Sequence, residues 1–325
     1  MTPIHRASVL LVMLAGLPAV APLQTLAAEQ AGPRAVLVTG ASSGIGRNIA
    51  ETLAAAGHFV YAGARKDADL AELDAIPNVK AVRLDVTVQA DIDAAVRFIG
   101  EQGRGLYGIV NNAGVGVFGP MNDTPEEDLD FVFDVNVYGP YRVNKAFAPL
   151  LIESGGRTTT IGSISGFISG AHSGTYSMSK FAVEAYTEAL AEEMAADGVL
   201  VSVVEPGRYK SRIREKVALH DLGVALEDTA ALDAAGKQAL RGMIDRNNDL
   251  KEPDEVAAAV LHALFADSPK LRYMVVPDAV EANVTVRAAL GRVVQLNADQ
   301  AYSYDRDQLV ALLDSLQSEL PAATR

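Results

Sequence analysis

The sequence predicts an α/β protein with a doubly wound parallel sheet of about seven strands and helices on both faces. Two observations support this fold class. Apolar runs typical of buried strands alternate with helical stretches from residue 35 to residue 276. The first run, Ala35–Val38, ends in a glycine-rich turn that leads into a helical stretch over residues 47–56. Right-handed crossovers in such a sheet place ligands above the carboxyl ends of the strands.

The other expected strands follow at intervals typical of βαβ units. They span residues 58–62, 79–84, 109–111, 158–162, 199–205 and 273–276. The alternation of strands and helical stretches stops over residues 208–250. These residues are rich in charge, contain several glycines and lack a β pattern. This stretch predicts a mobile helical flap over a ligand pocket, and the alternative is a solvated insertion. Residues 279–325 predict further helices, used for packing or for contact between subunits.

The composition is that of an ordinary globular chain. Its 325 residues, 49% of them hydrophobic, are enough to bury the core of one large domain with additions. The net charge of −13 argues against nucleic acid or an anionic membrane surface as the main partner. The chain has no cysteine, and its 5 histidines show no metal-ligand spacing. We therefore expect no disulfide, no thiolate nucleophile and no metal.

The N-terminal residues 1–28 resemble a targeting segment. His5 and Arg6 precede an uncharged apolar run, 7–21, and small residues follow near Ala28. The pattern predicts a signal peptide and export to the periplasm. An uncleaved membrane anchor and a tail on a cytoplasmic enzyme are the alternatives. The predicted organisation is thus this segment, a main domain over 29–278 that includes the flap, and a helical extension over 279–325.

The glycine-rich turn over residues 39–46 reads TGASSGIG. The first backbone N–H groups of the helix that follows point at this turn, so an anion is its natural occupant. Gly40, Gly44 and Gly46 let a diphosphate approach the main chain without meeting a Cβ atom. Three glycines alone also fit an ordinary turn, but here they open a βαβ unit, which favours a dinucleotide site.

Small and polar residues follow three more of the expected strands. These stretches are 111–114 (NNAG), 162–165 (GSIS) and 205–207 (EPG). Each alone is typical of a turn. Together with the glycine-rich turn they place four such segments along the edge where a ligand binds in this class of sheet.

Tyr176 and Lys180 lie four residues apart, so a helix places them on one face. A tyrosine with a pKa of about 10 needs a shift of about three units, or about 4 kcal/mol, to act near neutral pH. One charge at about 4 Å, with an effective dielectric of about 20, supplies about that energy. Ser163, at a strand end, could donate a hydrogen bond to a carbonyl oxygen that gains charge. Without the glycine-rich turn, the same spacing would indicate only a stacked surface pair.

The motifs occur together in a definite order: TGASSGIG at 39–46, NNAG at 111–114, Asn136, Ser163, YSMSK at 176–180 and PG at 206–207. This set resembles the short-chain dehydrogenase/reductase family, over about residues 34–277. The resemblance implies a single-domain Rossmann fold that forms the catalytic domain. It also implies that Tyr176 is the general acid/base and that Lys180 lowers its pKa and binds the nicotinamide ribose. By the same resemblance Ser163 polarises the carbonyl, and Asn136 extends a proton relay through water.

The resemblance also implies a set of cofactor-binding residues, with Asp85 at the adenine, Asn112 and Gly114 as walls of the site, and 206–207 against the nicotinamide. The expected set is Gly40, Ser42, Ser43, Gly44, Ile45, Gly46, Arg65, Asp85, Asn112, Ala113, Gly114, Tyr176, Lys180, Pro206 and Gly207.

The end of the second strand indicates which dinucleotide is preferred. NAD-selective sites place Asp or Glu there for the ribose 2′-hydroxyl. Here the strand ends in Gly63-Ala64-Arg65-Lys66, with two bases and no acid. Arg65 and the Ser42 hydroxyl could bind a 2′-phosphate, so we expect NADP(H) rather than NAD(H). Ser43 argues the other way, because many NADP-preferring relatives have a basic residue there.

The sequence therefore predicts an NADP(H)-dependent oxidoreductase that moves a hydride between the nicotinamide and a carbonyl or secondary alcohol. Residues 110–120, with Phe118, and the flap would form a pocket for a small apolar substrate, as in the hydroxysteroid and retinol branch that this region resembles. A non-catalytic NADP(H) sensor or scaffold is the alternative, and within enzymes an epimerase or dehydratase fits the glycine spacing less well. The family resemblance suggests a homodimer or tetramer.

Overall fold

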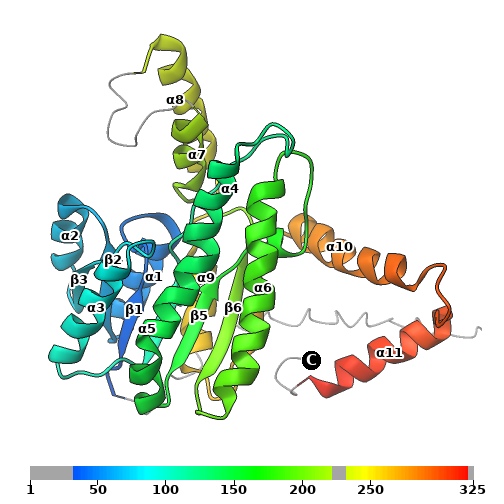
Figure 1. Cartoon of the computed structure of the whole chain (residues 1–325), viewed down its shortest axis with the longest axis horizontal. Coiled ribbons are helices and arrows are strands. Elements are labelled where there is room, and N and C mark those ends of the chain that lie inside the picture. Colours follow the sequence, from blue (N-terminus) through cyan, green and yellow to red (C-terminus); the bar gives the residue numbers. More distant parts are fainter. Residues whose placement is uncertain (1–31, 222–231, 321–325) are drawn as a thin grey trace, which may run out of the picture. The chain divides into compact units, whose positions relative to one another are not determined.

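The computed structural model describes residues 32–221 and 232–320, so the predicted targeting segment, 1–28, lies outside the described residues. A parallel sheet of 7 strands forms the centre of the fold, in the order β3-β2-β1-β4-β5-β6-β7 (Figure 1). The order reverses between β1 and β4, which is where a doubly wound sheet opens a crevice for a ligand. The predicted fold class is confirmed.

All seven expected strands are present, with bounds shifted by a residue or two in most cases. They are β1 Ala35–Val38, β2 Phe59–Ala64, β3 Val79–Arg83, β4 Gly108–Asn111, β5 Arg157–Ile161, β6 Leu200–Pro206 and β7 Arg272–Val275. β2 continues two residues beyond the expected end at Ala62, because Gly63 and Ala64 remain paired with β3.

The helices that connect and cover these strands are α1 Gly44–Ala55, α2 Asp67–Asp74, α3 Gln89–Glu101, α4 Glu126–Phe133, α5 Gly139–Ser154, α6 Gly174–Ala195, α7 Ile213–Asp221, α8 Ala234–Asn248, α9 Asp254–Phe265, α10 Ala279–Asn297 and α11 Arg306–Glu319. A π-helical turn, Asp134–Tyr138, joins α4 to α5, and a 3₁₀ turn, Ile164–Gly166, follows β5. Helix α1 begins at Gly44, three residues before the expected start at Arg47.

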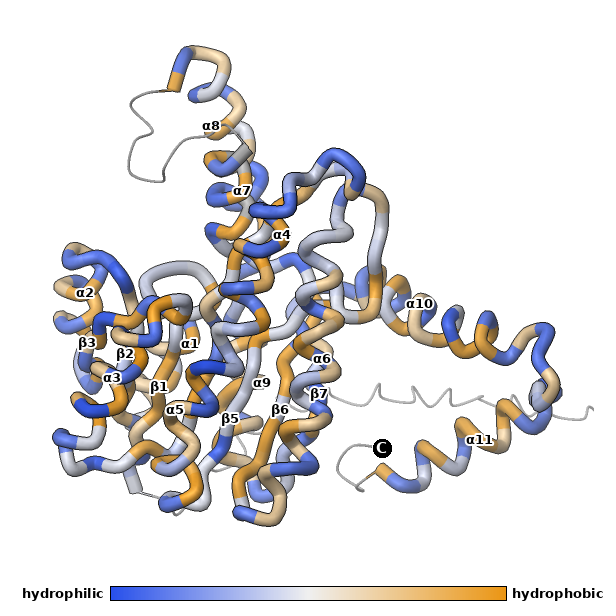
Figure 2. The backbone as a smooth tube through the Cα atoms, viewed as in Figure 1, coloured by the Kyte–Doolittle hydropathy of each residue, from blue (hydrophilic) through white to orange (hydrophobic). Residues whose placement is uncertain are grey.

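Two hydrophobic layers sandwich the sheet. Val36 and Val38 of β1 pack with α1 and α9 on one face, whereas Leu37 packs with α3 and α5 on the other. This alternation follows from the two-residue period of a strand. Figure 2 shows β1 and β6 as largely hydrophobic, as expected for strands that are covered on both faces.

The region predicted as a flap contains α7 and α8, which lie beyond the carboxyl ends of the strands (Figure 1). The prediction of helices without β structure is therefore confirmed for the described part of 208–250. Helix α7 contacts α4, since His220 Nε2 lies 2.8 Å from Asp128 Oδ1. Within residues 32–221 and 232–320, no helix is both long and apolar enough to cross a bilayer.

Candidate active site

A cleft of about 430 Å³ lies at the carboxyl ends of the strands, where the sequence predicts the ligand site. The predicted residues that line it are Gly40, Ser42, Ser43, Gly44, Ile45, Gly46, Arg65, Asp85, Asn112, Ala113, Gly114, Ser163, Tyr176, Lys180, Pro206 and Gly207. Asn136 is the one predicted site residue that does not line the cleft. The fold thus brings the four predicted strand-end segments into a single site.

The glycine-rich turn has the backbone that its sequence suggests. Gly40 and Gly44 have φ angles of +62° and +56°, in the left-handed region that favours glycine. A Cβ atom on Gly46 would overlap Asn112 Nδ2 and the carbonyl oxygen of Gly40. All three glycines are therefore needed for this close path, and the turn leaves the N-terminus of α1 open toward the cleft.

Asn112 and Thr39 fasten the glycine-rich turn to the end of β4. Asn112 Nδ2 donates to the carbonyl oxygens of Thr39 and Gly40, at 3.0 and 3.1 Å. Thr39 Oγ1 in turn accepts from the backbone N–H groups of Asn112 and Ala113, both at 3.0 Å. These bonds hold the turn rigidly, so a diphosphate would meet a preformed cradle.

Ser163, Tyr176 and Lys180 meet at one side of this cleft. Lys180 is 6% exposed, and its Nζ atom donates to the carbonyl oxygen of Ile161 at 2.8 Å. The same nitrogen lies 5.6 Å from the centroid of the Tyr176 ring. Ser163 is also buried and hydrogen bonds with Tyr176. The Phe118 ring lies 5.6 Å from the Tyr176 ring, centroid to centroid, so the phenol has an apolar neighbour on another side.

The charge state of the phenol depends mainly on its burial. Burial raises the pKa of Tyr176 to about 12, although its hydrogen bond with Ser163 lowers it. Burial also lowers the pKa of Lys180 to about 8, against the opposing effect of the Glu184 carboxylate. The lowering of this pKa by Lys180 stays a prediction; burial is the largest influence on the phenol, and the Lys180 nitrogen donates to Ile161.

Asn136 lies in the π-helical turn between α4 and α5, and its side chain contacts the backbone of Val115 and the hydroxyl of Ser179. Its Oδ1 atom accepts from Val115 N, and its Nδ2 atom donates to Val115 O, both at 2.9 Å. Nδ2 also donates to Ser179 Oγ at 3.0 Å. π-Helical turns are rare and frequent at functional sites. Here the turn aims Asn136 at the loop after β4, which borders the cleft.

Arg65 and Asp85 meet where the adenosine end of a dinucleotide is expected. Arg65 Nη1 lies 3.3 Å from Asp85 Oδ2, and Asp85 Oδ1 accepts from the Thr87 hydroxyl at 2.7 Å. Burial opposes ionisation of Asp85, but the hydrogen bonds from Thr87 and the charge of Arg65 lower its pKa overall. Asp85 therefore stays ionised and keeps Arg65 at the edge of the cleft.

Sequence reasoning missed several residues that α7 and the segment before it bring to the cleft. The missed lining residues of this segment with polar or charged side chains are Tyr209, Ser211, Arg212, Lys216 and His220, and Asp69 of α2 lines the cleft as well. Burial lowers the pKa of Lys216, and the nearby charges of Arg65 and Arg212 lower it further. The segment 208–250 carries no motif, so its high density of charged residues is the only sequence feature that indicates a place beside the cleft.

A buried ionic cluster lies behind Lys180, also unforeseen from the sequence. Arg272 of β7 lies 3.0 Å from Glu184 and 3.6 Å from Glu205, nitrogen to oxygen. Burial raises the pKa of Glu205 to about 8, and the neighbouring Glu184 charge raises it as well. Both influences favour the protonated form of Glu205 beside the Glu184 carboxylate.

The chemistry of the cleft fits a dinucleotide and offers no metal centre. Among the described residues, no group of three His, Asp or Glu side chains could hold a metal ion. The glycine-rich turn at the N-terminus of α1 suits a diphosphate. Its backbone packs so closely that a Cβ atom on Gly46 would overlap its neighbours. Gly40, Asn112 and Pro206 border the space that such a cofactor would occupy.

Comparison with known proteins agrees with this arrangement. The family model described as "short chain dehydrogenase" matches residues 34–221. The mitochondrial D-beta-hydroxybutyrate dehydrogenase of Rattus norvegicus is 33% identical over 270 residues, which cover 77% of this chain and 78% of the relative. Retinol dehydrogenase 5 of Mus musculus is 33% identical over 258 residues, covering 73% of this chain and 79% of the relative.

Solved structures show the same fold. A short-chain dehydrogenase from Streptomyces avermitilis has a TM-score of 0.64 and 29% identity, and the match covers 82% of this chain and 95% of that one. The actinorhodin polyketide ketoreductase, solved with NADPH, has a TM-score of 0.64 and 27% identity, covering 77% of this chain and 98% of the other. A Burkholderia phymatum family member solved with NAD has a TM-score of 0.67 at 23% identity, covering 84% and 98%, respectively.

The chain therefore belongs to the short-chain dehydrogenase/reductase family. Its class of activity follows: it is an NAD(P)-dependent oxidoreductase that acts on hydroxyl or carbonyl groups. The family and the class of activity that the motifs predict are both confirmed.

Proposed function

We propose that the protein is an NADP(H)-dependent oxidoreductase that moves a hydride between the nicotinamide and a carbonyl or secondary alcohol, with Tyr176 as general acid/base. The observation that supports this most is the meeting of Ser163, Tyr176 and Lys180 beside the glycine-rich turn in one cleft. A binding module has no need of a buried phenol, so the arrangement favours an enzyme over the sensor or scaffold alternative.

Each of the three side chains has a task that its surroundings support. With a pKa of about 12, Tyr176 holds its proton at neutral pH and is ready to donate it to a carbonyl oxygen. Ser163 stabilises the charge that develops on that oxygen. Lys180, which lines the cleft, adds positive charge there and would hold the nicotinamide ribose. A bound nicotinamide would supply or accept the hydride, and its oxidised form would add positive charge near the phenol.

The preference for NADP(H) is supported by the charges at the adenosine end of the cleft. Arg65, Lys66, Arg212 and Lys216 all line it. Arg65 and Arg212 repel the Lys216 ammonium, and a 2′-phosphate placed among these groups would relieve that repulsion. The end of β2 carries no carboxylate that would select the 2′-hydroxyl of NAD.

The substrate is proposed to be small and largely apolar. Val115, Phe131, Val135 and Leu219 line the cleft, and Phe118 packs beside Tyr176. α7, which supplies Leu219, would form the substrate flap of a catalytic domain over 29–278. The relatives named for D-beta-hydroxybutyrate and for retinol differ widely in substrate size, so the apolar wall is the more informative guide.

Other features of the sequence remain proposals. Residues 1–28 would act as a signal peptide or an anchor that directs the enzyme to the periplasm or its membrane, with a cytoplasmic enzyme as the alternative. Residues 279–325 would form a helical extension that contributes to a homodimer or tetramer. Asn136 would extend a proton relay through water, since it contacts Ser179 one residue before Lys180.

The central test replaces Tyr176 by phenylalanine and measures NADPH oxidation over a broad panel of carbonyl compounds. We expect turnover to fall at least about 100-fold, the usual contribution of a positioned acid. NADPH binding, followed by nucleotide fluorescence, should stay nearly intact. Persistent turnover in the variant would disprove the assignment of the acid, whereas tight NADPH binding without turnover in the unaltered protein would favour the sensor.

Cofactor preference is tested with Arg65→Gln and Lys216→Gln. Each change should lower kcat/KM for NADPH by about tenfold, the usual loss for a charge-assisted hydrogen bond, and leave kcat/KM for NADH unchanged. Arg97→Gln, which removes an exposed positive charge on α3, is the matched control. Equal kcat/KM values for NADH and NADPH in the unaltered enzyme would contradict the proposal.

A further inference from the structure

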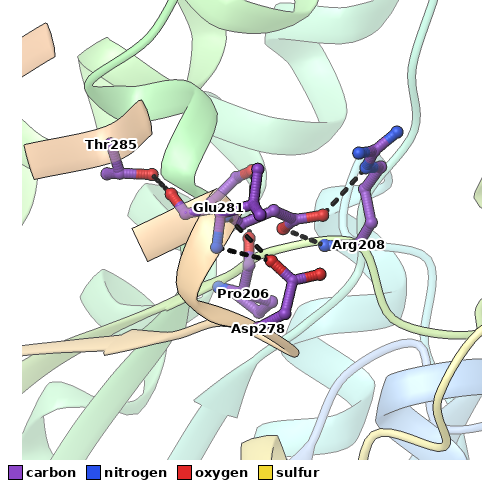
Figure 3. Close-up of polar contacts among 7 residues, drawn as sticks. Pro206, Arg208, Asp278, Glu281 and Thr285 are labelled. Atoms are coloured by element: carbon purple, nitrogen blue, oxygen red, sulfur yellow. Dashed lines mark hydrogen bonds and ion pairs between the residues drawn. The ribbon is translucent and has the colours of Figure 1, made fainter. Parts of the chain in front are cut away.

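The turn that follows β6 is bonded to a helix that lies outside the region matched by the family model. Glu281, in the first turn of α10, accepts a hydrogen bond from Arg208 N at 2.9 Å and another from Arg208 Nε at 2.8 Å. Figure 3 shows the two carboxylate oxygens directed at these two donors. Glu281 is 7% exposed, so the carboxylate is buried against the turn.

Several contacts hold Glu281 in place. The Asp278 side chain caps α10, because its Oδ1 atom accepts from the N–H groups of Val280 and Glu281, both at 2.9 Å (Figure 3). Thr285 Oγ1 donates to the carbonyl oxygen of Glu281 at 2.8 Å. The backbone of the first turn of α10 is thus fixed at both ends, and Glu281 presents a rigid carboxylate rather than a mobile one.

The fit between Glu281 and the turn is close. A Cβ atom on Gly207 would overlap Glu281 Oε2. On the sheet side, Gly207 N donates to Val275 O at 2.7 Å. Residues 206–208 are therefore held between β7 and the Glu281 side chain, and glycine at 207 is what leaves room for that side chain.

The other end of the same turn reaches Ser163. Ser163 Oγ donates to the carbonyl oxygen of Pro206 at 3.4 Å and accepts from Ser165 N at 3.1 Å. The hydroxyl has one proton for two acceptors, Pro206 O and the Tyr176 oxygen, so the position of Pro206 O affects how that proton is shared. A continuous set of contacts thus runs from Glu281, through residues 206–208, to Ser163 beside Tyr176.

We propose that Glu281 is a positioning residue, which fixes the 206–208 turn so that the Ser163 hydroxyl lies correctly for the reaction. This inference rests on the proposed function and deepens it: helix α10, in the predicted C-terminal extension, helps to shape the active site. A carboxylate suits the task, because it has two oxygens for two donors of the same residue. The backbone N–H of Arg208 would otherwise lack this acceptor.

The principal variant is Glu281→Gln, which keeps the shape of the side chain but turns an N–H₂ group toward one of the two donors. Gly207→Ala is an independent second variant, because its Cβ displaces the carboxylate without altering it. Arg287→Gln, at an exposed position of the same helix, is the control. Arg208→Gln removes only the ion pair, from a side chain that is 67% exposed, and keeps the backbone N–H.

We expect Glu281→Gln and Gly207→Ala to lower kcat by about 10–100-fold, the range for a small displacement of a catalytic group. KM for the carbonyl compound should change little in both variants, and the affinity for NADPH should change little in Glu281→Gln. Arg208→Gln should have a small effect, since an exposed ion pair contributes little. Arg287→Gln should behave like the unaltered enzyme. A loss of thermal stability with unaltered kcat in the folded fraction would instead indicate a merely structural residue and would overturn the proposal.

Amide hydrogen exchange of the cofactor-free protein gives a readout that does not depend on activity. The Arg208 amide should be protected in the unaltered protein and should exchange faster in Glu281→Gln. An unprotected Arg208 amide in the unaltered protein would refute the contact even if both variants failed to fold. Failure of the proposed function appears separately, as an active Tyr176→Phe variant or an inactive parent.

Discussion

Replacement of Glu205 by glutamine should change how the stability of the protein depends on pH. Glu205 is 2% exposed and lies 3.6 Å from Arg272 and next to Glu184. Burial, followed by the charge of Glu184, raises its pKa to about 8. Glutamine has the shape of the protonated carboxyl group and an N–H₂ group that can donate to Glu184, so it imitates the neutral form at every pH.

The sign of the effect follows from proton binding. Between pH 4.5 and about 8 the folded protein holds a proton on Glu205 that the unfolded chain has released. The stabilising contribution is therefore complete below pH 4.5 and is lost as the pH rises through 8. At about 1.4 kcal/mol per pKa unit, the loss amounts to a few kcal/mol. The glutamine variant should not suffer this loss.

Urea unfolding at pH 5, 7 and 9 measures the effect. The free energy of unfolding of the parent should fall between pH 5 and pH 9 by a few kcal/mol more than that of Glu205→Gln. Glu188→Gln is the control, because Glu188 also pairs with Arg272 but is 57% exposed. Parallel pH dependences for the parent and Glu205→Gln would refute the assignment of a raised pKa to this group.

Two further changes test the scaffold of the site. Gly46→Ala should weaken NADPH binding, because its Cβ overlaps Asn112 Nδ2 and displaces the glycine-rich turn; isothermal titration would show unaltered affinity if this were wrong. Asn136→Ala leaves the N–H and carbonyl groups of Val115 without their partner and should lower the free energy of unfolding by about 1–3 kcal/mol. Chemical denaturation would contradict that reasoning if the midpoint did not move.

The sequence predicts the strands and most of the cleft for one physical reason. In a parallel sheet the carboxyl ends of all strands lie on one edge, so polar segments at those ends must converge. Asn112, Ser163 and Pro206 each lie within two residues of the carboxyl end of a strand, and each lines the cleft as predicted. Tyr176 and Lys180 share a face of α6 because they lie one helical turn apart.

The residues that the sequence did not reveal depend on tertiary contacts. Lys216 and Arg212 reach the cleft only because the segment that leads into α7 lies against the glycine-rich turn, with Ser211 and Arg212 next to Gly44, and no local pattern encodes that contact. Burial, the largest influence on the pKa of Tyr176, cannot be predicted from the spacing of Tyr176 and Lys180, because spacing shows which charge is near but not how deeply the phenol is buried. Glu281 lies 118 residues beyond Ser163 and has no motif of its own.

The chemistry of the cleft therefore depends on residues after 221, where the match to the family model ends. Arg272 of β7 neutralises the carboxylate cluster behind Lys180, and Val275 of the same strand binds the backbone of Gly207. α10 begins only four residues later, and its Glu281 binds the next residue, Arg208. Residues 272–281, one continuous segment, thus set both the charge near Lys180 and the position of residues 206–208 beside Ser163. Because these contacts need no substrate, variation in this segment would alter the rate of proton transfer for every substrate alike, whereas changes in α7 would alter which substrates fit.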